Sequence, residues 1–423
     1  MNRMKRHTHV HQWLFLALAI SIPFSLKLST FILILLLVNR LISGNFNKTL
    51  LKEKWVRWWI ISAGMFFILL ACRSLFESNP GLAFKVSERK AAFLLVPLAL
   101  LTSTPPTEKQ RRNFVMGYSI SILLLTLYVL IDATIRASLE HCISPFFYHN
   151  LGSPFHLHAV YFSALLITNL ILSESIEDFP LRTVFQLWLL ALLILLSSKL
   201  MILIALAVLS YFSLKRNHPK RTLKWLVRGA FILPVLLIAI TNNPVSKRFT
   251  DVSTSRLKYI NAISIGPDVY LDGLSLRILQ LRFALEIVQT DGILFWGTGP
   301  GSSQAALDAK YRSLNLYEPK EGKSKGYIGY NFHNQYAETL VQGGVFSFIS
   351  LIACFGFLFA IAKKKQLEML FIFSLMFMLF CLTESVFERQ QGVFTFLVFA
   401  CWFIQNPAET KNASQKLNKP DLL

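Results

Sequence analysis

The chain has 423 residues, of which 54% are hydrophobic and only 16% are charged. Because a soluble globular domain carries roughly 25% charged residues, this composition excludes a soluble enzyme and a disordered chain. Apolar runs of helical length recur along almost the whole sequence, which excludes a transmembrane β-barrel. The formal net charge of +20 is then explained first by the positive-inside rule rather than by nucleic-acid binding.

Twelve apolar runs predict an all-α, polytopic membrane protein with about 12 transmembrane helices. In chain order they cover residues 12–26, 28–42, 56–72, 91–102, 113–133, 156–172, 184–197, 200–214, 226–243, 333–361, 367–383 and 391–404. The first run follows three basic residues, and no small-residue cleavage site comes after it. We therefore expect a retained signal anchor that forms the first helix. The five scattered cysteines give neither a disulfide framework nor zinc-ligand spacing.

The distribution of Lys and Arg predicts the orientation of these helices. With the N-terminus in the cytoplasm, 24 basic residues fall in inner segments and 8 in short outer loops, so both termini are expected inside. The predicted parts are N-terminal transmembrane helices (1–243), a long outer loop (244–332), C-terminal transmembrane helices (333–404) and a cytoplasmic tail (405–423). Loops as long as 244–332 are uncommon and usually functional when ordered.

The long loop contains a predicted amphipathic helix over 275–290. One apolar stripe of this helix is formed by Ile278, Leu281, Leu285 and Val288. Arg277 and Arg282 lie about 140° apart on it, so they cannot bind the same group. One guanidinium can fork onto a phosphate while the other faces lipid head groups; alternatively, both only anchor an interfacial helix. The following GTGPG segment, 297–301, is a predicted tight turn and lacks the glycine spacing of a nucleotide site.

Two polar residues lie at the edges of apolar runs. His333 stands where the long loop meets the next run, and on a helix starting there it shares a face with Tyr336. An imidazole, with a pKa of about 6.5, can take a proton from a hydroxyl; the alternative is an interfacial histidine bonded to loop backbone. Lys199 separates two apolar runs, so we expect it to form a tight outer turn or to meet a buried anion.

Glu384 and Arg389 lie between the last two runs, where they either line a polar site or brace the outer turn. The sequence has no Walker motif, no metal-ligand spacing and no serine-nucleophile elbow. We therefore expect neither a metal nor a cofactor. Any chemistry in this protein must use a substrate that is already activated.

Taken together, these residues resemble a known family. An arginine helix (Ser275-Leu276-Arg277, then Ala284-Leu285-Glu286) precedes the glycine turn 297–301, His333-Asn334-Gln335-Tyr336 opens the next span with Gly344 behind it, and Leu382-Thr383-Glu384-Ser385 precedes Glu388-Arg389-Gln390. This pattern resembles the O-antigen ligase and O-antigen polymerase superfamily of bacterial inner membranes. The likeness covers about the whole chain, with its specific motifs mainly in 275–347.

The resemblance implies a metal-independent glycosyltransferase with a GT-C-like helical fold and a periplasm-facing active site. Its donor is a glycan on undecaprenyl diphosphate. A ligase passes this glycan to a sugar hydroxyl of lipid A–core, whereas an O-antigen or exopolysaccharide polymerase passes it to another lipid-linked repeat. By resemblance, His333 is the general base and Arg277 holds the donor diphosphate. Further substrate contacts are expected from Lys199, Arg282, Asn334, Tyr336, Glu384 and Arg389.

Two other interpretations belong to different functional classes. A transporter or flippase of lipid-linked glycan fits less well, because the predicted spans are nearly free of internal charge and show no repeat. A non-catalytic assembly protein of the same fold is the third alternative. The main support for this alternative is Lys199, which stands where the family commonly has an arginine. In every case the expected partners include membrane lipids and exclude nucleic acid.

Overall fold

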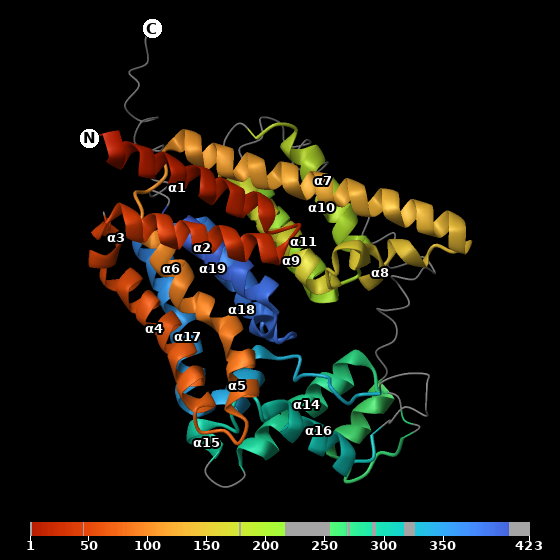
Figure 1. Ribbon diagram of the computed structural model, residues 1–423. Helices are drawn as coiled ribbons and strands as arrows, with labels where there is room; N and C mark the ends of the chain where they lie inside the picture. The colour runs from red at the N-terminus through yellow and green to blue at the C-terminus, as the bar shows by residue number, and fades with distance from the viewer. Residues whose placement is uncertain are drawn as a thin grey trace.

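The computed structural model describes residues 2–44, 46–176, 179–215, 254–267, 269, 271–289, 293–316 and 326–405. Within these ranges every regular element is a helix (Figure 1). The longer helices are α1 (Asn2–Ser21), α2 (Leu26–Ser43), α4 (Lys54–Ser74), α5 (Pro80–Ser87), α6 (Ala92–Leu101), α7 (Glu108–Glu140), α9 (Ala159–Glu174), α10 (Arg182–Leu195), α11 (Lys199–Lys215), α14 (Gly273–Val288), α16 (Ser303–Ser313), α17 (Gln335–Lys365), α18 (Glu368–Phe380) and α19 (Gln390–Ile404). Short ones are α3 (Thr49–Lys52), η1 (Glu88–Ala91), η2 (Ser144–Phe146), α8 (His149–Gly152), η3 (Ser153–Phe155), η4 (Thr254–Asn261), α15 (Ile293–Trp296) and η5 (Val386–Glu388).

The predicted apolar runs coincide with helices wherever the structure describes them. The run at 226–243 and the tail at 406–423 lie outside the described residues. Four of the described helices, α2, α4, α7 and α17, are long and apolar enough to cross a membrane. A fifth candidate is the pair His149–Phe155 and Ala159–Glu174, bent by 81°. The described residues therefore confirm an all-helical fold with several helices able to span a membrane, while a total of about 12 spans and the side on which the long loop lies stay predictions.

Two apolar cores hold the described helices together. The larger core joins the apolar helices, and it encloses Phe387 from the turn between α18 and α19. The ring centre of Phe387 lies 5.0 Å from that of Phe93 and 5.2 Å from that of Phe396. These contacts with α6 and α19 anchor the turn in the larger core. A second core joins α14 and α16 to the start of α17. Figure 1 shows α14 and α16 together in the lower part of the view, and we call them the lower unit; α15 packs against α17 beside them.

Helix α17 is broken near its start, and the glycine turn 297–301 fits into the break. Gly344 has φ 67° and ψ −169°, so the carbonyl groups just before it leave the helical ladder. The backbone N–H of Thr298 donates to the carbonyl of Val341 at 2.7 Å, and that of Gly299 donates to the carbonyl of Gln342 at 3.0 Å. A side chain at Gly344 would overlap the carbonyl of Phe295. The predicted tight turn is therefore a structural junction between the loop and α17.

Candidate functional site

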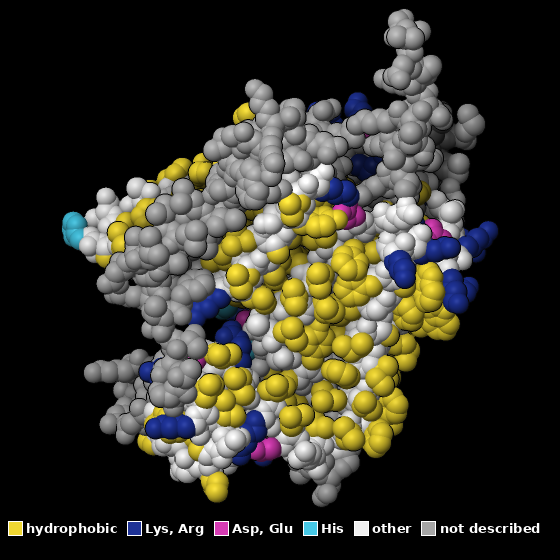
Figure 2. All heavy atoms as spheres, turned by 180° about the vertical axis from the view of Figure 1, so that it is seen from behind, with side chains coloured by type: hydrophobic (Ala, Val, Ile, Leu, Met, Phe, Trp, Pro, Cys, Tyr) yellow, Lys and Arg dark blue, Asp and Glu magenta, His cyan; other side chains and the backbone are white. Residues whose placement is uncertain are grey.

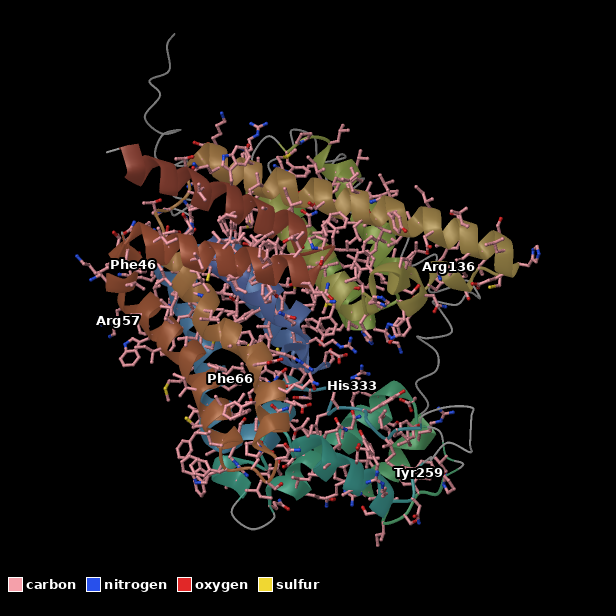
Figure 3. All side chains as sticks on the ribbon, in the orientation of Figure 1. Phe46, Arg57, Phe66, Arg136, Tyr259 and His333 are labelled. Atoms are coloured by element: carbon pink, nitrogen blue, oxygen red, sulfur yellow. The ribbon has the colours of Figure 1, made fainter. Side chains whose placement is uncertain are left out.

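His333 lies immediately before α17, at the place where the lower unit meets the other helices (Figure 3). We expected it to lie within the helix, and this was wrong: α17 begins at Gln335, and His333 has φ 45°. Its backbone N–H donates to Oδ1 of Asn331 at 3.0 Å, which holds the left-handed turn. The imidazole is therefore presented by a fixed turn at the helix start rather than by a helix face.

Glu384 is the partner of His333. Nδ1 of His333 lies 3.2 Å from Oε1 of Glu384, and the side chains are 23% and 6% exposed, respectively. Burial alone would raise the pKa of Glu384, but its hydrogen bond to His333 and the charges of His333, His158 and Arg277 outweigh this effect and lower it. Glu384 is thus held as a carboxylate, which favours the His333 tautomer with the proton on Nδ1.

Arg277 reaches the same turn from the lower unit. Its Nε donates to the carbonyl of Thr383 at 3.0 Å, and its Nη1 donates to the carbonyl of Gly273 at 2.9 Å. Arg277 lies on α14, whose N-terminus is capped by Asp272. The Asp272 carboxylate accepts hydrogen bonds from the backbone N–H groups of Leu274 and Ser275. The structure thus brings Arg277 and His333 to adjacent residues of one turn, although Arg277 lies on α14 and His333 lies just before α17.

The part of the chain that contains Arg277 and His333 is similar to a known protein family. Residues 185–352 match the family model described as O-antigen ligase. This segment is similar to the O-antigen ligase family. The predicted resemblance to the O-antigen ligase and polymerase superfamily is therefore confirmed. None of the curated proteins compared with the chain matches it. Both Arg277 and His333 lie inside the matched segment, whereas Glu384 lies beyond its end.

Asn334 and Tyr336, which also lie in the matched segment, fix the start of α17. Oδ1 of Asn334 accepts from the N–H groups of Tyr336 and Ala337 at 3.0 Å, and its Nδ2 donates to the carbonyl of Leu382 at 3.1 Å. The hydroxyl of Tyr336 donates to the carbonyl of Met378 at 2.9 Å. These bonds tie His333 to the end of α18. Substrate contacts by Asn334 and Tyr336 stay predictions.

Three other predicted substrate-binding residues are placed differently. Arg389 is exposed on the turn that also carries Glu384, with its guanidinium 5.5 Å from the ring centre of Tyr161. Arg282 is 2.6 Å from Glu286 and also donates to the carbonyl of Ile260, so its guanidinium is engaged within the lower unit. Lys199 opens α11 directly after a turn containing Ser197 at φ 54°, which confirms the predicted break between two apolar runs.

A buried polar chain behind the site was missed by sequence reasoning. Nζ of Lys90, which is fully buried, lies 2.8 Å from Oε1 of Glu388 and 3.1 Å from Oε1 of Gln342. Gln342 in turn donates to Glu338 at 2.9 Å, and Ser385 donates to the other Glu338 oxygen at 2.9 Å. The sequence signal that could have revealed this chain is Glu338, a carboxylate inside the apolar run 333–361. An isolated charge there is costly, so Glu338 requires buried polar partners.

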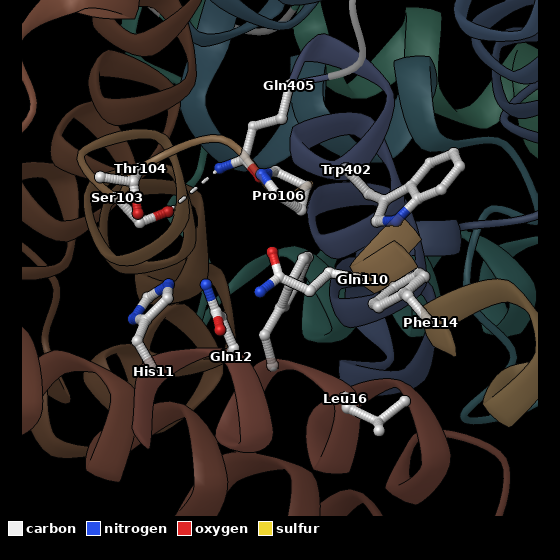
Figure 4. A pocket seen from close by; sticks show the side chains of 11 residues that line it. His11, Gln12, Leu16, Ser103, Thr104, Pro106, Gln110, Phe114, Trp402 and Gln405 are labelled. Carbon is white, nitrogen blue, oxygen red and sulfur yellow. Dashed lines mark hydrogen bonds between the residues drawn. The ribbon is translucent and has the colours of Figure 1, made fainter. Parts of the chain in front are cut away.

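Another recess lies at a different place in the fold, between α1, α7 and the end of α19 (Figure 4). Its polar lining includes His11, Gln110 and Gln405, and Gln405 donates to the Ser103 hydroxyl at 3.3 Å. It contains none of the predicted site residues. This recess is therefore not part of the His333 site.

Proposed function

We propose that this protein is a ligase-type glycosyltransferase that moves glycan from undecaprenyl diphosphate to a sugar hydroxyl. The observation that carries the proposal is the His333–Glu384 pair beside Arg277, at the start of α17. A base and a fixed cation are the two groups that such a transfer requires. Their position at the end of a candidate membrane span suits a substrate whose lipid lies in the bilayer.

His333 serves as the general base. With the proton of Nδ1 directed to Glu384, Nε2 carries the lone pair that can accept a proton from the acceptor hydroxyl. The carboxylate then stabilises the imidazolium that forms, and it fixes the orientation of the ring. Glu384 acts through His333, so we regard it as a positioning residue.

Arg277 and the exposed Arg389 bind the diphosphate leaving group. The acceptor oxygen attacks the anomeric carbon of the donor glycan, and the bond from that carbon to the diphosphate oxygen breaks. The electron pair leaves with the diphosphate, where negative charge accumulates, and the hydroxyl proton passes to His333. Fixed guanidinium groups stabilise the growing charge, and Arg277 can do so in a forked geometry.

The acceptor in this proposal is lipid A–core on the periplasmic face of the bacterial inner membrane. A polymerase would use the same donor groups and differ only in its acceptor, a second carrier-linked repeat. The reaction proposed for these residues uses no nucleotide and no cofactor, because the donor already carries its leaving group. Lys199 and Arg282 are retained as proposed contacts to more distant parts of the substrates.

Transfer in proteoliposomes tests the proposal. Purified protein receives undecaprenyl-diphosphate glycan together with either lipid A–core or a second glycan carrier, in EDTA and without nucleotide. Glycan on lipid A–core supports the ligase, whereas a ladder of longer carrier-linked chains makes it a polymerase. The matched control is His141→Asn, since His141 is exposed at the end of α7 and Asn tolerates its positive φ. No product with either acceptor contradicts the proposal.

A further inference from the structure

Helix α14 carries apolar side chains on two faces, and only one of them is covered. The covered face packs into the core of the lower unit through Leu276, Leu279, Phe283 and Ile287. The other face exposes Leu274, Ile278, Leu281 and Leu285. Their spacing of four, three and four residues makes one continuous stripe along the helix. The predicted stripe is thus corrected in one member, because Val288 is buried.

The stripe is bordered by charge on both sides. Arg277 lies along one edge, where it bonds the carbonyl of Thr383. Arg282 lies along the other edge, in an ion-pair network with Glu286 and Lys310. A narrow apolar stripe between basic edges is typical of helices that lie in the plane of a membrane interface.

The apolar surface continues through α15 to a membrane-spanning helix. All three of Leu294, Phe295 and Trp296 are exposed, Trp296 to 60%. The Trp296 ring lies 5.3 Å from that of Phe346, which is itself exposed on α17 together with Ile349 and Ile352. Figure 2 shows hydrophobic side chains gathered over a broad area of one face of the molecule. The lower unit therefore extends an apolar surface that begins on a candidate membrane span.

We propose that α14 and α15 lie in the lipid head-group region, with the stripe Leu274/Ile278/Leu281/Leu285 and the α15 side chains in contact with acyl chains. Continuity with α17 favours lipid over a second copy of the chain, and Trp296 belongs to the residue type enriched at membrane interfaces. A separate water-exposed apolar surface of this extent would be unusual. In this position the lower unit presents Arg277 and the His333 site at the level of lipid phosphates.

Photo-crosslinking to lipid tests the inference directly. A benzophenone amino acid is placed at Leu281 or Leu285 on the stripe, with Ile278 as a further position. The control is Ala309, which is exposed on α16. Proteins are reconstituted in phosphatidylethanolamine–phosphatidylglycerol vesicles that contain no prenyl lipid. We expect the stripe positions to give phospholipid adducts at several-fold higher yield than Ala309.

Three results would overturn the inference. Equal adduct yields at the stripe and at Ala309 would place the stripe in water. A crosslinked dimer would make it an interface between copies. Adducts that form only after undecaprenyl diphosphate is added would assign it to the donor chain. Because crosslinking needs no transfer, the same experiment in the His333→Ala background must give unchanged adducts, and this separates the membrane contact from the proposed function.

Discussion

The imidazole of His333 and the carboxylate of Glu384 meet across 51 positions of sequence, with Nδ1 and Oε1 3.2 Å apart. The pair joins the loop before α17 to the turn after α18, and Arg277 bonds the residue next to Glu384. The turn after α18 therefore carries the orienting carboxylate and contacts both the proposed base and the proposed anion-binding group. The first predictions concern this turn.

Replacing Glu384 with Gln should lower kcat by roughly tenfold or more, with little change in the KM for the acceptor, because the amide neither fixes the tautomer nor stabilises the imidazolium. Protein folding should be retained, since the side chain keeps its size. The rate is measured over a range of pH in proteoliposomes. Wild-type rates in Glu384→Gln at every pH would show that His333 does not depend on this carboxylate.

Acid should destabilise the wild-type protein partly through Glu384. Its pKa in the folded state is lowered from the usual 4.5 despite its burial, chiefly by the hydrogen bond to His333. Its contribution to the free energy of unfolding is therefore present above pH 4.5 and is lost as the pH falls through the lowered pKa. Thermal unfolding in detergent should show a steeper acid loss for wild type than for Glu384→Gln. Parallel curves would contradict the pairing.

Arg277→Ala should weaken donor use by about 10- to 100-fold, the range expected for a charge-assisted hydrogen bond of 1.5–3 kcal/mol. Arg277→Lys should restore only part of it, because an ammonium lacks the guanidinium fork. The KM for the donor is the measurement. Arg312→Ala is the control: Arg312 is exposed at the end of α16, and its loss should leave the KM for the donor unchanged. An equal effect on KM from Arg312→Ala and Arg277→Ala would contradict the assignment of Arg277.

Gly344→Ala should cost more than about 3 kcal/mol of stability, because Gly344 has φ 67° and a side chain there would overlap the carbonyl of Phe295. Gly356→Ala is a matched control in the same helix, where no atom lies within 4 Å of the added Cβ. Melting of detergent-solubilised protein should show a large loss for the first variant and none for the second. Equal melting temperatures would mean that the glycine turn does not depend on this break.

Lys90→Met should destabilise the protein by about 3–5 kcal/mol, because it leaves Glu388 without its buried cation. Adding Glu388→Gln to Lys90→Met should recover part of that loss, since the uncompensated charge disappears. The melting temperatures of the two single variants and the double variant measure this coupling. Strictly additive effects would show that the 2.8 Å pair carries no coupling energy.

The sequence predicted those features that local patterns encode. Apolar runs located the helices, and the polar break at Lys199 located the turn between α10 and α11. Glu384 was recognised as a residue of the outer turn, but not as the partner of His333. That contact, the buried Lys90 chain and the fit of the glycine turn into broken α17 all join residues far apart in sequence. Periodicity carries no information about such pairings, so only the folded structure reveals them.

The most direct test of the proposed mechanism is the rate of glycan transfer from undecaprenyl diphosphate to lipid A–core, compared between wild type and His333→Ala in proteoliposomes. General-base catalysis is typically worth about 10²- to 10⁴-fold, so we predict a rate loss in that range with the protein still folded and inserted. His141→Asn should transfer glycan at the wild-type rate. Transfer by His333→Ala at the wild-type rate would contradict the assignment of His333 as the base.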